Sequence, residues 1–290
     1  MRRFHYTLLF LFVSCLLVKT SRADLFSDVN HAYLPGEVTS LMAGENNLPI
    51  IQVDAQSPLP LGTAVILTEP FPSSITLAEG HSLATMLSEK GWNVIISPFH
   101  LPLKEPSDDT DSNEAQEPNK DTAQIASIHP RSNSLSQHAD FNATQGALQI
   151  QLNALNNFIK DRQGYRLYIA QGMVAAAYIS ATREQPSLYP DTFVAISPFW
   201  PELAINNQVV EHVAQSEFPV LDLSLSNFNG WATITHERRR ISAKNALKLH
   251  YRQINIPNNS SYFSMTPNQK SPYIQLVANN TIGWTRHLGW

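Results

Sequence analysis

The 290-residue sequence is poor in cysteine and in charge, and it has no excess of basic side chains. Charged residues make up 15% of the chain, below the ~25% that is typical of soluble domains. There are 20 Lys and Arg against 24 Asp and Glu, so the charge balance gives no indication of nucleic-acid binding. Histidines and carboxylates show no ligand spacing, so we expect no metal and no cofactor.

The first 23 residues have the pattern of a secretory signal peptide. Arg2 and Arg3 form a charged start, residues 7–18 are an apolar run, and Ser21 and Ala23 are small residues at the positions a signal peptidase reads. The run is shorter than the ~20 residues a membrane-spanning helix needs, which disfavours an uncleaved anchor. No later segment is long and apolar enough to span a membrane. The pattern predicts cleavage after Ala23 and a periplasmic or secreted protein.

Cleavage after Ala23 would change both the charge and the chemistry of the chain. It removes four basic residues, which leaves 16 against 24 acidic ones and a formal net charge of −8. The single cysteine, Cys15, lies inside the signal, so the mature protein has no thiol and no disulfide, which suits an oxidising compartment. The alternative is a lipoprotein with lipid on Cys15, but Phe12 stands where a leucine is usual.

Apolar runs typical of buried strands alternate with helical patterns along most of the chain. Such strand–helix–strand crossovers predict a mostly parallel, doubly wound α/β sheet with helices on both faces. We assign residues 24–61 to an N-terminal arm, with a short edge strand at 48–53, and residues 62–290 to the domain. The predicted strands are 64–67, 92–97, 165–170, 192–197, 219–223 and 250–256, and the predicted helices are 75–90, 147–159, 173–181, 238–249 and 274–288.

Residues 104–140 interrupt this alternation. Within them, residues 105–121 contain seven acidic side chains and one lysine, among Pro, Ser, Asn and Gln. Such a composition cannot bury enough apolar surface to fold alone. We predict a disordered acidic insertion that forms a solvated loop, with a functional lid or docking tail as the alternative.

The turn after the strand 165–170 has the pattern of a nucleophile elbow. Gln171, Gly172 and Met173 lead straight into a helix of small residues, which lets a helix approach the sheet closely and exposes one residue at the turn. In this class of fold, ligands bind at the carboxyl ends of the strands. The residues predicted to line that crevice are Glu69, Phe71, Gln171, Gly172, Met173 and Asn227.

These elements resemble the α/β-hydrolase fold and, more narrowly, a bacterial family of exported proteins of unknown function with that fold, typical of Gram-negative bacteria. The matching pieces are residues 64–67 with 91–94, the Gln171-Gly172 turn, residues 219–223, residues 250–253 and Gly283-Trp284. Their order covers roughly residues 60–290. The resemblance implies an α/β-hydrolase-like sheet.

The same resemblance shows that the catalytic residues of such hydrolases are missing. The pattern Gly-x-Ser-x-Gly places Gly172 at the nucleophile, and glycine has no nucleophilic atom. Residues 224–228, where the acid is usual, contain no carboxylate, and Asn227 cannot stabilise an imidazolium as aspartate does. Residues 257–263, where the base is usual, contain no histidine.

These departures favour a non-catalytic protein. Pro70 and Pro72 also supply no backbone N–H to an oxyanion hole in the loop after the first core strand. We therefore expect a binding or envelope-associated pseudohydrolase rather than an enzyme. Its expected partner is a small molecule or an envelope component. This expectation is an analogy from the fold, which by itself does not fix function.

A serine esterase or hydrolase with a displaced triad is the alternative. The pentapeptide Gly80-His81-Ser82-Leu83-Ala84 matches the serine-hydrolase pattern, but it lies in a predicted helix, whereas an elbow needs a strand before it. A third hypothesis is an interaction protein that acts through residues 105–121. The residues of a displaced triad would be Ser82, Ser97 or Ser197 with Asp222 and His81 or His250, or members from the insertion, namely His129, His138 and Asp140.

Two charged features inside predicted elements have structural interpretations. Asp222 lies within the strand 219–223, where a carboxylate can hold a neighbouring loop by accepting N–H bonds. Three arginines at 238–240 begin a predicted helix, which indicates a solvated face. Contact with a phosphate or a lipid headgroup is the alternative for this basic run.

Overall fold

The structure is a computed structural model that describes residues 38–69, 74–103, 139–226, 228–257 and 271–290. The chain divides into residues 1–38 and residues 39–290, and the second unit contains nearly all the described elements. The predicted signal peptide at 1–23 lies outside the described residues. None of the described helices is long and apolar enough to cross a membrane.

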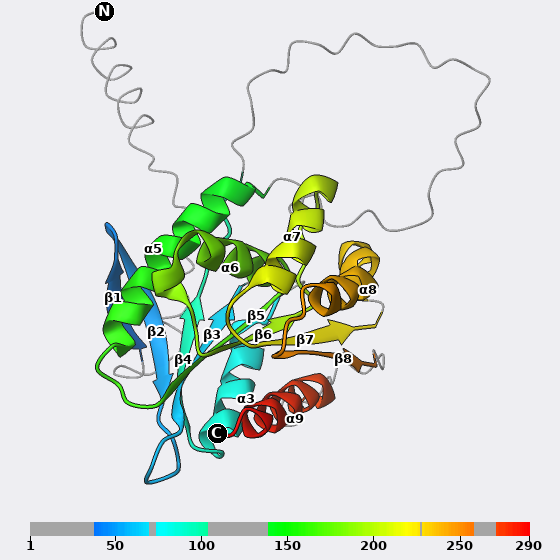
Figure 1. The fold of residues 1–290 in the computed structure, drawn as a ribbon. Coiled ribbons are helices and arrows are strands. Elements are labelled where there is room, and N and C mark those ends of the chain that lie inside the picture. Colours follow the sequence, from blue (N-terminus) through cyan, green and yellow to red (C-terminus); the bar gives the residue numbers. More distant parts are fainter. Residues whose placement is uncertain (1–37, 70–73, 104–138, 227, 258–270) are drawn as a thin grey trace, which may run out of the picture. The chain divides into compact units, whose positions relative to one another are not determined.

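One eight-stranded sheet organises the domain, with the order β1-β2-β4-β3-β5-β6-β7-β8 (Figure 1). β2 pairs antiparallel with β4, and every pair from β4 to β8 is parallel. The predicted mostly parallel sheet is thus confirmed. The strands are β1 (Val38–Ala43), β2 (Asn46–Val53), β3 (Gly62–Thr68), β4 (Trp92–Pro98), β5 (Tyr165–Gln171), β6 (Thr192–Ile196), β7 (Val220–Leu225) and β8 (Tyr251–Ile256).

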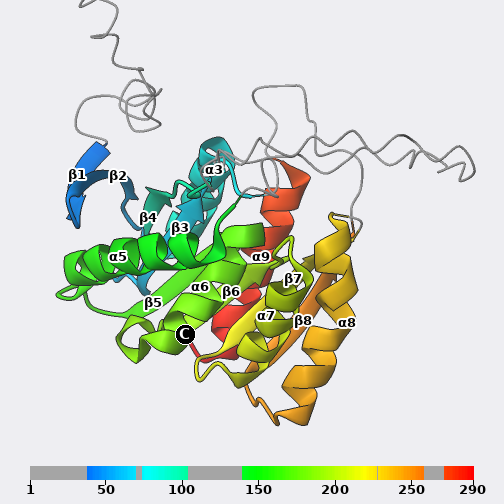
Figure 2. The same cartoon turned by 90° about the horizontal axis from the view of Figure 1, so that it is seen from above.

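Helices cover both faces of the sheet, as the sequence predicts (Figures 1 and 2). α3 and α9 pack against each other on one face. The other four pack side by side on the opposite face, α5 on α6, α6 on α7 and α7 on α8. The helices are α3 (Leu77–Ser88), α5 (Phe141–Ile159), α6 (Gly172–Glu184), α7 (Leu203–Gln215), α8 (Gly230–Asn245) and α9 (Pro272–His287), with a short 3₁₀ helix at Pro186–Leu188.

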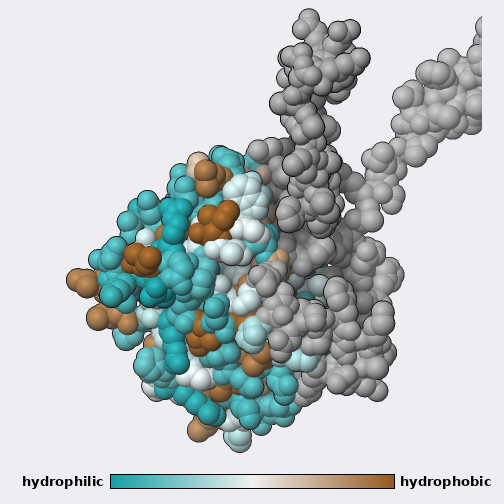
Figure 3. Space-filling model, turned by 90° about the vertical axis from the view of Figure 1, so that its right-hand side faces the viewer, coloured by the Kyte–Doolittle hydropathy of each residue, from teal (hydrophilic) through white to brown (hydrophobic). Residues whose placement is uncertain are grey.

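The core lies where the central strands are buried on both faces. Every residue of β3 and of β6 is buried, as expected of continuous β-branched runs in a parallel sheet. α6 is buried along almost its whole length, because Ala175, Ala176 and Ala177 allow it to lie close to the sheet. On the face drawn in Figure 3, hydrophobic residues stand in small separate groups among hydrophilic ones, which is ordinary for a domain with its apolar residues inside.

The sheet begins before the predicted domain boundary at residue 62, and the strand predicted at 48–53 lies within β2. β1 and β2 lie within residues 24–61, which we assigned to an arm before the domain boundary at 62. Leu48, Ile50 and Ile51 of β2 are buried, and Ile51 pairs with Ile96 of β4. Burial against β4 therefore makes this stretch part of the domain's sheet.

Helix starts differ from the predictions where a side chain caps the first turn. α8 begins at Gly230 rather than at residue 238, because the Asn229 side chain accepts hydrogen bonds from the amides of Trp231 and Ala232. α5 begins at Phe141, after Asp140 has capped the amide of Ala143. The sequence pattern predicts no helix at the place of α7.

The two ends of the predicted insertion lie side by side. Leu103 and Ala139 form an isolated antiparallel bridge, and the amide of Asp140 donates to the carbonyl of Pro102 at 3.1 Å. The chain therefore leaves and re-enters the described domain at one place, next to the start of α5. The predicted disorder of residues 104–140 lies outside the described residues, except for the last two.

Candidate functional site at the carboxyl edge of the sheet

The turn between β5 and α6 has the geometry of an elbow with glycine at its apex. Gln171 is still extended, with φ −124° and ψ 151°, and α6 begins at the very next residue, Gly172. Gly172 has a φ of 62°, in the left-handed region that costs little only for glycine. A residue with a side chain would be strained at this turn, as the nucleophile of such an elbow is.

The residues on either side of Gly172 are held firmly. Gln171 is buried, and its Oε1 accepts a hydrogen bond from the hydroxyl of Tyr273 in α9 at 2.5 Å. Met173 is fully buried, and the carbonyl of Gly172 accepts from the amide of Phe199 at 3.4 Å. The turn is therefore tied to α9 and to the segment after β6.

Glu69 follows directly after β3, at the same edge of the sheet. β3 and β5 are parallel neighbours with Ile66 opposite Ile169, so Glu69 and Gly172 follow the carboxyl ends of two adjacent strands. The backbone at this point is closed by a hydrogen bond from the amide of Glu69 to the carbonyl of Ile75.

The carboxyl group of Glu69 has an unusual environment. The residue is only 2% exposed, and within the described part of the chain neither carboxylate oxygen has a hydrogen-bond partner. Burial raises the pKa of Glu69 to about 8. The nearby Ser74 hydroxyl opposes this rise in part, although its Oγ makes no hydrogen bond of normal geometry. At neutral pH this group is therefore mostly a neutral acid.

The structure brings together four of the six residues predicted to line the crevice. Glu69, Gln171, Gly172 and Met173 all lie at the carboxyl ends of β3 and β5. Phe71 and Asn227 lie outside the described residues. The sequence pattern gave no sign of Ser74 and Tyr273 as neighbours of this edge, because both come from other segments of the chain.

Asp222 is a second buried carboxyl group, but it is fully satisfied. It is 0% exposed, and Arg239 of α8 pairs with both of its oxygens, Nε–Oδ2 at 2.7 Å and Nη2–Oδ1 at 3.2 Å. Tyr251 and Gln253 of β8 also donate to Oδ2, at 2.8 and 2.9 Å. Burial alone would raise the pKa of Asp222, but Arg239 and these hydrogen bonds outweigh it and hold the pKa below its usual value.

This ion pair also changes the interpretation of the arginine run. Arg239 is fully buried, and besides Asp222 it donates to Thr235 Oγ1 at 2.8 Å. The predicted solvated face is therefore wrong for Arg239, which ties α8 to β7. Arg238 donates to Asn207, and Arg240 pairs with Glu237 on the surface of α8. Asp222 accepts N–H bonds as predicted, but they come from Arg239 of α8 and Gln253 of β8 and not from a neighbouring loop.

Each of the three serines considered for a displaced triad uses its hydroxyl elsewhere in the fold. Ser97 and Ser197 are fully buried, and Ser82 lies on α3, in a helix as predicted. None of their hydrogen bonds in the described structure involves a histidine. The partners are the Ala78 carbonyl for Ser82 at 3.1 Å, Gln151 Nε2 for Ser97 at 2.8 Å and the Leu225 amide for Ser197 at 2.8 Å.

The pentapeptide at residues 80–84 has a packing explanation. A Cβ atom on Gly80 would lie 2.6 Å from Cγ2 of Thr68, which is too close for any ordinary contact. Glycine at this position therefore allows α3 to approach β3. The match to a serine-hydrolase motif arises from this close contact and not from an elbow.

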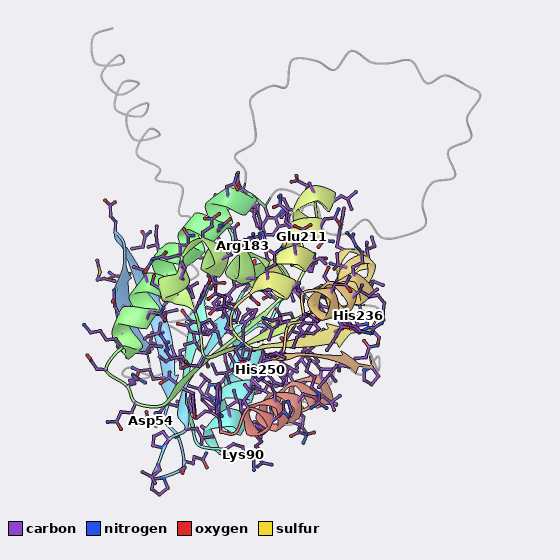
Figure 4. All side chains as sticks on the ribbon, viewed as in Figure 1. Asp54, Lys90, Arg183, Glu211, His236 and His250 are labelled. Atoms are coloured by element: carbon purple, nitrogen blue, oxygen red, sulfur yellow. The ribbon has the colours of Figure 1, made fainter. Side chains whose placement is uncertain are left out.

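The histidines considered as bases lie on different elements. His250 precedes β8, so it lies at the amino end of a strand parallel to β5, whereas the elbow lies at the carboxyl end (Figure 4). His81 lies in the first half of α3. Across the described ranges, no three His, Cys, Asp or Glu side chains come together as a metal site would need. His129 and His138 lie outside the described residues.

The fold is similar to those of solved hydrolases. The neighbours include a dienelactone hydrolase from Anabaena variabilis, with a TM-score of 0.50 and 13% identity over 86% of this chain and 96% of that one. A sugar hydrolase from Lactococcus lactis has a TM-score of 0.54 and 10% identity over 87% and 98%. The esterase domain of a Rhodothermus marinus protein has a TM-score of 0.52 and 12% identity over 86% and 97%.

No protein-family model matches the sequence, and no curated protein sequence matches it either. At identities this low, likeness in structure shows the fold and not the activity. The chain has the α/β-hydrolase fold, as the strand order and helix layers indicate.

Proposed function

We propose that the protein is a non-catalytic member of the α/β-hydrolase fold that binds a small molecule at the carboxyl edge of its sheet. The observation that carries this proposal is Gly172 at the apex of the elbow, with a φ of 62°. Covalent acyl transfer needs a nucleophilic atom at that point, and glycine has none. What is left is an edge with one buried carboxyl group, that of Glu69, and a helix start.

The signal-peptide pattern at the N-terminus supports a location for this function outside the cytoplasm. A signal peptide cleaved after Ala23 would send the protein to the periplasm or out of the cell. Loss of the only thiol with that peptide agrees with such a compartment. We therefore propose that the ligand is a small molecule of the envelope, or a component of it.

A serine hydrolase with its catalytic serine outside the elbow is the second candidate, and one contact favours it. Ser180 Oγ and His212 Nδ1 lie 2.9 Å apart between α6 and α7. Burial, with Arg183 nearby, lowers the pKa of His212, so this histidine is neutral at pH 7 and could accept a proton. Within the described structure no carboxylate contacts His212 to orient it as a third triad member would.

The test is labelling of the mature protein, residues 24–290, with a fluorophosphonate probe, alongside hydrolysis of short acyl esters. The proposal expects no labelling and no turnover from a sample whose circular dichroism shows it to be folded. A labelled serine, located by peptide mapping, would overturn it. If label appears, the variant Ser180→Ala distinguishes the two sources: loss of label assigns the activity to the α6–α7 pair, and retention assigns it elsewhere.

A further inference from the structure

A cavity of about 460 Å³ lies between three helices on one face of the sheet, α5, α6 and α7 (Figure 2). Its volume is within the range of ~300–1,000 Å³ that small-molecule sites have. The cavity is separate from the elbow, because Ser180 lies eight residues after Gly172, or about 12 Å along α6 at a rise of 1.5 Å per residue. Most of its lining is neutral and polar, from Asn142, Gln145, Ser180, Gln208 and His212.

The amide group of Gln145 is buried at this cavity without a partner. The residue is 7% exposed, and its side chain makes no hydrogen bond to any of the described residues. Gln151 of the same helix is equally buried, yet its Nε2 donates to Ser97 Oγ at 2.8 Å and to the carbonyl of Pro98 at 3.0 Å. Buried amides are almost always paired, so the partners of Gln145 come from the cavity that it lines.

A contact between a serine and a histidine forms another part of the wall. Ser180 Oγ and His212 Nδ1 lie 2.9 Å apart, which leaves Nε2 of the ring without a hydrogen-bond partner among the described residues. Burial, with Arg183 nearby, lowers the pKa of His212, so the ring is neutral at pH 7. A neutral imidazole has one donor and one acceptor, so its second nitrogen can form one hydrogen bond with a ligand.

The two charged residues that line the cavity are exposed and of opposite sign. They are Arg183, labelled in Figure 4, and Glu184, both in the last turn of α6. The buried lining residues Gln145 and Ser180 carry no charge. An amide or a hydroxyl group offers donors and acceptors without a charge, which suits the hydroxyl groups of a neutral ligand better than it suits an ion.

We propose that this cavity binds a neutral carbohydrate through Gln145, His212 and Phe141. A sugar ring has hydroxyl groups around its edge, which are both donors and acceptors, and C–H groups on its faces. The hydroxyl groups match Gln145 and His212, and a C–H face matches an aromatic ring. Phe141 lines the cavity, and its ring is held edge-on against Trp200 with the centroids 4.8 Å apart. This site goes beyond the proposed function and does not rest on it.

The experiment measures the binding of glucose and of maltose to the mature protein by saturation-transfer NMR and calorimetry. Cyclohexanol, a ring of the same size with one hydroxyl group, is the control for apolar contact, and glucose 6-phosphate is the control for attraction to Arg183. We expect at least one of the two sugars to bind, about tenfold or more tighter than cyclohexanol and no more weakly than glucose 6-phosphate. No binding of either sugar, equal binding of cyclohexanol, or tighter binding of glucose 6-phosphate overturns the proposal.

Two variants locate the bound sugar in the cavity. Gln145→Leu removes the amide group, and we expect it to weaken binding about tenfold or more, as for a buried polar contact that is lost. Gln275→Leu makes the same change at an exposed position of α9, on the opposite face of the sheet, and should leave binding unchanged. Unchanged binding by Gln145→Leu, or an equal loss in both variants, overturns the proposal. If Gln145→Leu does not fold, Gln208→Leu makes the same test at an exposed lining residue of α7.

Sugar binding and the fluorophosphonate result are decided separately. Binding is measured without any chemical step and at a different place from Gly172, so either proposal can fail while the other holds. A labelled protein that binds sugar would remove the non-catalytic proposal and leave the carbohydrate site in place. An unlabelled protein that binds neither sugar would remove the carbohydrate site alone.

Discussion

Two regions of the same sheet bury a carboxyl group, and they differ in how it is satisfied. In the β7–β8–α8 region, Asp222 meets Arg239, Tyr251 and Gln253, and its pKa is lowered. At the β3–β5 edge, Glu69 meets no partner among the described residues, and its pKa is raised. Asp222 is the more deeply buried of the two, yet its pKa is the one that is lowered, so the partners decide the direction of the pKa shift.

This difference teaches which buried charge is structural and which indicates a site. Asp222 comes with its own cation and ties two strands to a helix. Glu69 is buried without a charged partner among the described residues, which destabilises the folded protein. Proteins tend to keep such a group where function requires it. The position of Glu69 at the same edge of the sheet as the elbow, rather than its burial alone, makes it the better candidate for ligand contact.

The largest expected effect comes from making Asp222 resemble Glu69. Arg239→Met leaves Asp222 buried without its cation, and we expect a loss of about 3–5 kcal/mol in the free energy of unfolding. Urea denaturation at pH 7 measures this loss. The matched control is Arg240→Met, which breaks an exposed pair with Glu237 and should change little. Equal effects of the two variants would show that the buried pair is not special.

The next largest effect is expected from removing the buried carboxyl group of Glu69, which should change how stability depends on pH. A proton stays on folded Glu69 up to a pH of about 8, whereas the unfolded chain loses it near 4.5. Stability is therefore expected to fall as the pH rises from about 4.5 to 8, by roughly 1.4 kcal/mol per pKa unit at most. Glu69→Gln should remove this fall and be more stable than wild type at pH 8, as measured by thermal unfolding.

Asp222 is expected to change stability with pH in the opposite direction from Glu69, which sharpens the comparison. Its pKa is lowered in the folded protein, so its contribution is present above the unfolded value of 3.8 and is lost as the pH falls through the folded pKa. Acid unfolding of Glu69→Gln should thus resemble that of wild type. A Glu69→Gln curve that is parallel to wild type between pH 5 and 8 would contradict the raised pKa.

A smaller effect tests the packing of α3 against β3, the strand that ends just before Glu69. Gly80→Ala places a methyl group against Thr68, the residue before Glu69, and forces α3 away from β3. We expect a destabilisation of about 1–3 kcal/mol, typical of overpacking. Gly146→Ala is the control, because a Cβ on Gly146 of α5 meets nothing within 4 Å. A destabilised control with an unaffected Gly80→Ala would contradict the close contact of α3 with β3.

The smallest effect tests the start of the helix that carries Arg239. Asn229→Ala removes the cap of α8, and we expect a loss of about 1 kcal/mol. Thermal unfolding measures the change, and Asn229→Ser, which keeps a capping oxygen, should recover most of it. A loss as large as that of Arg239→Met would mean that the cap also holds the ion pair.

The parts of the fold that could be predicted from the sequence are those set by local patterns. The strand at Tyr165–Gln171 runs into a helix of small residues, and this pattern alone placed an elbow with Gly172 at its apex. α7 was missed because Asn206, Asn207 and Gln208 interrupt its apolar pattern, although Val209 and Val213 are buried. Asn206 is buried too, and its side chain bonds to the backbone of Trp200 and Trp231, which no local rule predicts.

The pairing of charges could not be predicted either. Arg239 lies between two other arginines, so in sequence it belongs to a basic run, and only the turn of α8 directs it inward to Asp222. In the same way, Gln171 and Tyr273 are 102 residues apart, yet their side chains meet. Glu69 was predicted at the crevice, but its lack of a partner follows from what the rest of the fold leaves beside it.

The sequence by itself determined the alternation of strands and helices, the glycine at the elbow and the absence of carboxylate and histidine from residues 224–228 and 257–263, because these are properties of neighbouring residues. Only the tertiary structure decided the order of the strands, the pairing of β1 with β2 and of β2 with β4, and which buried carboxyl group has a partner. A pKa depends on every charge, dipole and apolar atom within a few ångströms, and distant segments bring those atoms together.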